Sequence, residues 1–200
     1  MERRMFGIRA AFPLLAAAIT AAALVGLACS QEDPEPIPEP EVTETTMTME
    51  ITSSAFTQGS SIPAQYSCDS DDISPKLSWS GVPEGTQSIA VIMDDPDAPG
   101  GTWVHRVIYG ISPDDDGLPE GVPPSDTLEG GAMQGKNDFG KTGYGGPCPP
   151  RGGPHRYFFK LYALDAEPKL GPGATKADLL REMNGSILAQ GELMGTYTRR

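Results

Sequence analysis

Residues 88–111 read SIAVIMDDPDAPGGTWVHRVIYGI and contain two strand patterns joined by a turn. The first part, 88–93, is a short uninterrupted apolar run that is typical of a central, buried strand. Apolar and polar residues then alternate over 103–111, which predicts a second strand. Period-2 spacing places four residues on one face of this strand: Trp103, His105, Val107 and Tyr109.

Two further segments carry strand patterns. From Met47, apolar Met47, Met49 and Ile51 alternate with Thr48, Glu50 and Thr52, which indicates a half-buried strand at the start of the domain, with both methionines in the core. Residues 155–164, HRYFFKLYAL, form an aromatic-rich strand. One face of it carries His155, Tyr157, Phe159 and Leu161. Both histidines of the chain are therefore expected on or beside strands.

One helix is expected near the C-terminus. Thr175 can cap it, with Asp178 three residues later. The apolar positions that follow at helical spacing are Leu179, Leu180, Met183 and Ile187. Asn184-Gly185 weakens the second half of this pattern.

A long segment without periodicity, residues 112–154, separates the strands that carry the two histidines. Eleven of its 43 residues are Gly and eight are Pro. Such a stretch inside a compact domain is usually functional or disordered. Its second half holds aromatic residues and a Cys between prolines, which favours an ordered binding loop.

The composition narrows the class of protein. Two hundred residues suit one ordinary domain, and 20 Pro with 24 Gly exclude a coiled coil and indicate a loop-rich fold rather than a helical bundle. A formal charge of −12 makes a nucleic-acid partner unexpected, because such binding needs a basic face.

The N-terminus has the three-part layout of an export signal over residues 1–28: early arginines, an Ala/Leu run without charge, and small residues before Cys29. Residues 26–29, GLAC, resemble a bacterial lipobox, which predicts that Cys29 is lipidated. Cleavage without lipid and an uncleaved anchor are the alternatives. Arg3 and Arg4 also echo a twin-Arg export signal.

Residues 29–46 form an acidic, Pro-rich tether in this interpretation. The stretch 30–46 holds four Pro and six acidic residues, with little apolar surface to bury. The expected organisation is an export signal over 1–28, the tether over 29–46 and a folded domain over 47–200. The domain would face the periplasm or the cell exterior, with the membrane as a partner through the lipid on Cys29.

If Cys29 carries lipid, Cys68 and Cys148 remain as a pair in an oxidising compartment. A disulfide between them is the expected outcome, and two free thiols are the alternative. No spacing of His or Cys matches a zinc signature, and there is no phosphate-binding P-loop, so no metal and no cofactor are expected.

Several short motifs together resemble the phosphatidylethanolamine-binding protein family, and in particular its bacterial branch of Raf-kinase-inhibitor-like proteins. The resemblance covers residues 49 to 199. The motifs that carry it are Asp94-Asp95-Pro96-Asp97-Ala98-Pro99, His105, Gly145-Gly146-Pro147-Cys148-Pro149-Pro150 and His155-Arg156-Tyr157. Two departures concern the loop at 68–72 and Arg106, which follows His105 where Trp is common.

The resemblance implies a mainly β fold, with an antiparallel β-sandwich-like core and a peripheral C-terminal helix. It also implies a small surface cavity that holds an anion such as a phosphate group. By the same resemblance, the cavity is lined by Asp95, Asp97, His105, Gly146, His155 and Tyr157.

The chemistry of these residues suits an anion. A phosphate needs several N–H or O–H donors, and the backbone of Gly145 and Gly146, the Tyr157 hydroxyl and two imidazoles can supply them. Asp95 is expected to accept from a ring N–H and so to orient a histidine. Asp97 has a plain structural alternative, because DPDAP is also a turn sequence.

These observations predict an exported, lipid-anchored binding protein for small phosphorylated or other anionic ligands, and not an enzyme. One alternative is a hydrolase that uses His and Asp as acid and base, or Cys148 as a nucleophile beside His155. Another is an inhibitor of a protease or kinase on the same fold.

Overall fold

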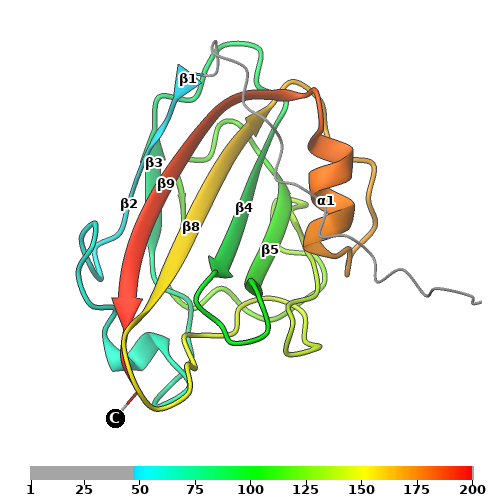
Figure 1. The fold of residues 1–200 in the computed structure, drawn as a ribbon. Helices are drawn as coiled ribbons and strands as arrows, with labels where there is room; N and C mark the ends of the chain where they lie inside the picture. Colours follow the sequence, from blue (N-terminus) through cyan, green and yellow to red (C-terminus); the bar gives the residue numbers. More distant parts are fainter. Residues whose placement is uncertain (1–46, 200) are drawn as a thin grey trace, which may run out of the picture. The chain divides into compact units, whose positions relative to one another are not determined.

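The computed structural model describes residues 47–199, which fold into two β-sheets and one α-helix (Figure 1). The larger sheet has the strand order β1-β9-β8-β4-β5-β7, and the smaller has the order β2-β3-β6. The elements are β1 (Met47–Thr48), β2 (Glu50–Thr52), the 3-10 helix η1 (Ala64–Tyr66), β3 (Leu77–Ser80), β4 (Ser88–Asp95), β5 (Trp103–Ile111), β6 (Gly117–Leu118), β7 (Met133–Gln134), β8 (His155–Leu164), α1 (Lys176–Met183) and β9 (Ile187–Tyr197).

Two apolar layers hold the domain together. The larger lies between the two sheets and contains Trp79 of β3, Met93 of β4 and Phe159 of β8. The smaller packs the other face of the large sheet against α1, with Val107 beside Leu179 in the same cluster. All strand pairs are antiparallel except β1 with β9. The prediction of a mainly β sandwich-like core with a peripheral helix is confirmed.

The strand expected from Met47 is divided between the two sheets. Met47 and Thr48 pair in parallel with β9, whereas residues 50–52 pair with β3. Met49 lies at the crossing and donates its N–H to the Gln190 carbonyl at 2.8 Å. Met49 and Ile51 are buried, as the alternation predicts.

A β-bulge in β5 corrects the predicted face of that strand. Met93 of β4 pairs with Arg106, but the next residue of β4 pairs with Val104, so His105 is the extra residue. At the bulge, the alternation of side chains between the two faces of the sheet shifts by one residue. The His105 ring contacts the ring of Tyr157 in the layer between the sheets, whereas Val107 and Tyr109 face α1. The four residues predicted to share one face are therefore split two and two.

The helix begins as predicted but ends early. Thr175 and Asp178 form a capping box, with side-chain and backbone bonds in both directions. The helix ends at Met183, and Gly185 follows with a positive φ of 84° that favours glycine. Ile187 therefore starts β9 and is not part of the helix.

The long segment 112–154 is irregular apart from the two-residue strands β6 and β7. A disulfide between Cys68 and Cys148 fastens it to the segment after η1, and this pairing is as predicted. The expected signal, Cys29 and the tether lie outside the described residues. Within 47–199, α1 is too short and too polar to cross a bilayer.

Candidate functional site

The sheet order brings three predicted site residues together at one end of the large sheet. Asp95 ends β4, and β4 lies between β5 and β8. His105 stands near the start of β5, and His155 is the first residue of β8. Because β4 is antiparallel to both neighbours, its end lies beside their beginnings (Figure 1).

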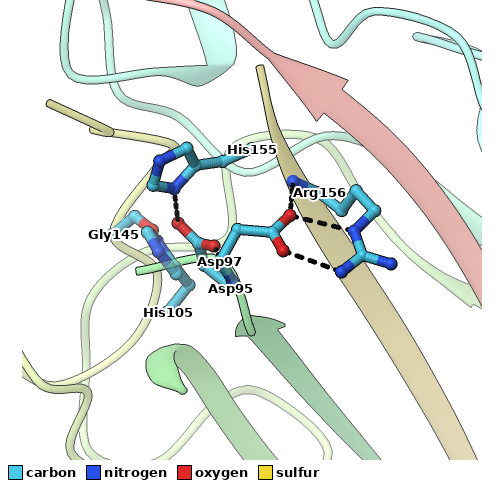
Figure 2. A network of polar contacts seen from close by, with 6 residues as sticks. All are labelled: Asp95, Asp97, His105, Gly145, His155 and Arg156. Atoms are coloured by element: carbon cyan, nitrogen blue, oxygen red, sulfur yellow. Dashed lines mark hydrogen bonds and ion pairs between the residues drawn. The ribbon is translucent and has the colours of Figure 1, made fainter. Parts of the chain in front are cut away.

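Asp95 holds His155 in place. Nδ1 of His155 lies 2.8 Å from Oδ2 of Asp95 (Figure 2). The other carboxylate oxygen of Asp95 accepts the backbone N–H of Asp97 at 2.9 Å. Because a carboxylate only accepts, Nδ1 of His155 carries the proton and Nε2 is the nitrogen left for a ligand. The orienting role expected for Asp95 matches this geometry.

Asp97 is turned to Arg156 and away from the histidines (Figure 2). Its Oδ2 accepts from Nε and the backbone N of Arg156, both at 2.9 Å, and its Oδ1 accepts from Nη2 at 2.7 Å. These bonds, with the guanidinium charge, lower the pKa of Asp97 to about 2. Asp97 therefore links the turn after β4 to the start of β8 through its hydrogen bonds with Arg156.

His105 is almost completely buried, with 2% of its surface exposed. Its Nδ1 lies 2.7 Å from the carbonyl oxygen of Gly145, which fixes Nδ1 as a donor. Burial lowers the pKa of His105, although the Gly145 carbonyl and the nearby Asp95 charge oppose this. Burial thus favours the neutral ring, in which Nε2 is an acceptor.

A cavity of about 190 Å³ lies between these side chains. Pockets for drug-sized ligands are typically about 300–1,000 Å³, so this one fits only a small group. It is lined by Asp95, Ala98, Pro99, Trp103, His105, Phe139, Cys148, Pro149, Pro150 and His155.

Gly146 is closely packed by its neighbours. Its N–H donates to Oδ1 of Asp72 at 2.7 Å, and a Cβ added to it would collide with the Tyr66 carbonyl. The N–H of Gly145 donates to the His105 carbonyl at 3.0 Å. Both backbone donors that the sequence offered to an anion are therefore used within the fold, and Gly146 does not line the cavity.

Tyr157 lies beneath His105. The two rings meet edge to face at 5.2 Å between centroids, and Tyr157 is fully buried. Its hydroxyl lies near the Asp95 carboxylate, without the geometry of a full hydrogen bond. Burial, helped by the nearby Asp95 charge, raises the pKa of Tyr157, so the hydroxyl keeps its proton. Tyr157, predicted as a lining residue, packs against His105 and is not among the residues that line the 190 Å³ cavity.

Two exposed aromatic residues at the cavity were not predicted as site residues. Trp103 and Phe139 are 37% and 39% exposed, and their rings meet at 5.4 Å. Phe139 also contacts the His105 ring at 5.3 Å. Phe139 comes from the irregular segment 112–154, whose path no periodicity could predict.

The described residues contain no group of three or more His, Cys, Asp or Glu that could hold a metal. The sulfur of Cys148 is bonded to Cys68 and is not a thiol. In this oxidised state, Cys148 cannot act as the nucleophile of the alternative hydrolase.

The fold and the cavity define a class of protein: a β-sandwich with a small, two-histidine pocket at one end of its larger sheet. A family model described as phosphatidylethanolamine-binding protein matches residues 52–198. The chain belongs to this family.

Similar proteins support the assignment. A UPF0098 protein of Methanothermobacter thermautotrophicus is 51% identical over 151 residues, which cover 76% of this chain and 99% of that protein. A UPF0098 protein of Aquifex aeolicus is 52% identical over 153 residues, covering 76% of this chain and 89% of that protein.

Two solved structures resemble the chain. The crystal structure of a phosphatidylethanolamine-binding protein homologue from Chlamydia trachomatis has a TM-score of 0.70 and 42% identity, and the match covers 78% of this chain and all of that one. That of E. coli YbcL, titled a new member of the mammalian family, has a TM-score of 0.71 and 36% identity, covering 76% of this chain and 99% of that one.

Proposed function

We propose that the protein is exported and lipid-anchored, and that it binds small phosphorylated or other anionic ligands without turning them over. The observation that carries the proposal is the His155–Asp95 pair at the wall of the 190 Å³ cavity. The carboxylate holds the ring through Nδ1, so Nε2 is the nitrogen left for a ligand, and an imidazolium donates to an anion from this atom.

The remaining features suit a small ligand. The cavity volume limits the bound part to a group the size of a phosphate with a short substituent. Charge-assisted hydrogen bonds to a phosphate oxygen are each worth roughly 1.5–3 kcal/mol, so a few of them suffice for measurable affinity.

Binding without turnover is supported by how the acid–base groups are used. Both carboxylate oxygens of Asp95 already accept hydrogen bonds, from His155 and from the Asp97 backbone. Cys148 is oxidised. Ester and phosphoester substrates should therefore survive incubation with the native protein. Reproducible hydrolysis that His155→Ala abolishes in a folded protein would contradict this part.

The binding test uses methyl phosphate in calorimetric titration of the purified full chain in detergent. A second arm replaces it with vesicles that contain phosphatidic acid, a lipid with the same phosphomonoester chemistry. Saturable binding of methyl phosphate supports a free ligand as the source, and binding of vesicles alone supports a lipid headgroup. Absence of binding in both arms contradicts the proposal.

The anchor has its own test. Metabolic labelling with a palmitate analogue should mark the native chain through Cys29, which stands at the end of the apolar run. Cys29→Ser should abolish the label, whereas Cys68→Ser should keep it. Equal labelling of native chain and Cys29→Ser would show that the lipid is not on Cys29.

A further inference from the structure

The wall of the 190 Å³ cavity holds no permanent positive charge. Its lining residues include the Asp95 carboxylate and no Lys or Arg side chain. The pair of Asp95 and His155 carries no net positive charge even when the imidazole is protonated. Arg156, the residue after His155, is paired with Asp97. An anion bound in the cavity must therefore draw its balancing charge from outside the wall.

Arg106 is a buried cation without a counter-ion. Only 1% of the residue is exposed. Its Nη2 donates to Oε1 of Gln134 at 3.2 Å, whereas its Nε has no hydrogen-bond partner within residues 47–199. In the same part of the chain it forms no ion pair with an acidic side chain. Burial lowers its pKa to about 10, so the guanidinium still carries its charge at neutral pH. Buried charges are normally paired, because desolvation of an unpaired one is strongly unfavourable.

The β-bulge in β5 turns Arg106 and His105 to the same layer. Arg106 pairs with Met93, and directly opposite residues of neighbouring strands share a face. Met93 and Tyr157, which contacts the His105 ring, both belong to the layer between the sheets. Consecutive residues of a regular strand would face opposite sides of the sheet. The bulge therefore places the buried cation directly beside the residue that lines the cavity, in an interior where water screens charge poorly.

We infer that Arg106 supplies the positive charge that balances the bound anion, acting across the intervening side chains without touching the ligand. The inference rests on the proposed function and adds a residue that sets its charge specificity. A ligand with two negative charges gains more from this guanidinium than a ligand of the same shape with one. The cavity should therefore prefer dianions, such as the fully ionised form of a phosphomonoester.

The size of the effect follows from Coulomb attraction, which is proportional to the charge of the ligand. At a separation of about 10 Å and an effective dielectric constant of about 20, the attraction corresponds to about tenfold in affinity for each unit of ligand charge. Arg106 should thus contribute about tenfold to a monoanion and about a hundredfold to a dianion.

Methyl phosphate and methyl sulfate are matched probes, because they have the same shape and differ in charge. Phosphomonoesters lose their second proton near pH 6, so at about pH 7 methyl phosphate is mainly a dianion and methyl sulfate a monoanion. Calorimetry on the full chain should show about a hundredfold loss for methyl phosphate and about a tenfold loss for methyl sulfate in Arg106→Met. The ratio of native to variant affinity is taken for each probe, so differences in their hydrogen bonding cancel.

Lys136→Met is the control variant. Lys136 is exposed and stands two residues after Gln134, the hydrogen-bond partner of Arg106. Because solvent screens an exposed charge, this variant should change neither affinity by more than about threefold. Circular dichroism checks that each variant is folded. If Arg106→Met does not fold, Arg106→Gln takes its place, since its amide can still donate to Gln134.

Unchanged affinities in the folded Arg106 variant would overturn the inference and leave anion binding intact. Equal losses for the two probes would also overturn it, because a merely structural role of Arg106 does not depend on ligand charge. Methyl phosphate should in addition bind the native chain at least about tenfold more tightly than methyl sulfate. Equal binding of the two by the native chain contradicts the charge specificity, and binding of neither removes the proposed function as well.

Discussion

Nδ1 of His155 lies 2.8 Å from Oδ2 of Asp95, and this contact joins the first residue of β8 to the last residue of β4. The two side chains are only 12% and 4% exposed. Neighbouring antiparallel strands thus supply a histidine and the carboxylate that orients it. The pair is fixed by the sheet itself and not by a loop, which suits a preorganised binding site.

Replacement of Asp95 by Asn should weaken methyl phosphate binding by about tenfold, because a neutral amide bonds Nδ1 of His155 more weakly than the carboxylate does and orients the ring less firmly. Calorimetry on the full chain measures the change. Asp97→Asn is the matched control, since Asp97 contacts Arg156 and makes no hydrogen bond to His155. Equal effects of the two substitutions would refute the role given to Asp95.

His105 should make the fold less stable as the pH falls. Its pKa is lowered in the folded state by burial, so below the unperturbed value near 6.5 the unfolded chain binds a proton that the native chain does not. Thermal unfolding of native protein should therefore occur at lower temperature at pH 5 than at pH 7. The shift should shrink in His105→Gln, and parallel pH profiles for the two proteins would contradict the prediction.

Asp97 should contribute to stability only above strongly acidic pH. Its folded pKa of about 2 lies below the usual value near 3.9, so the contribution is full above about pH 4 and is lost as the pH falls toward about 2. Asp97 and Arg156 are partly exposed, so we expect less than about 1 kcal/mol. Urea unfolding measures the free energy of unfolding at each pH. Asp97→Asn should reduce its fall at acidic pH, whereas substitution of exposed Glu84 by Gln should not.

Reduction of the Cys68–Cys148 disulfide should lower the free energy of unfolding by about 2–4 kcal/mol. It should also weaken methyl phosphate binding, because Cys148 and Pro149 line the cavity and Gly145 orients His105 from the same loop. Urea unfolding and calorimetry with and without a dithiol measure both effects. Two thiols titrating at Cys68 and Cys148 in unreduced, unfolded protein would show that the bridge does not form.

Much of the fold was predictable because strand patterns are local. The alternation around Met49 and Ile51 and the apolar run of β4 predicted their burial. The bulge at His105 was not predictable, since it depends on the register with β4. The helix was predicted too long because Ile187 continues the apolar spacing, although Gly185 ends the helix before it.

The candidate site was predictable only in part. The motifs of the family resemblance predicted that Asp95, His105 and His155 line one cavity. The order of strands in the large sheet explains how they meet there. The hydrogen bond from the Gly146 N–H was not predictable, because its acceptor, the Asp72 carboxylate, lies 74 residues away in sequence. Phe139 reaches the cavity from an irregular segment, and no periodic signal marks its position.

The central claim is that the cavity with the two histidines is the anion site. Calorimetric titration of methyl phosphate into native chain, into each single variant and into the double variant His105→Ala/His155→Ala tests it most directly. Loss of one hydrogen bond to the charged ligand, worth roughly 1.5–3 kcal/mol, predicts about 10- to 150-fold weaker binding for each single variant and no measurable binding for the double variant. Circular dichroism checks that each variant is folded. Equal affinity of native protein and folded double variant would place the ligand elsewhere and contradict the claim.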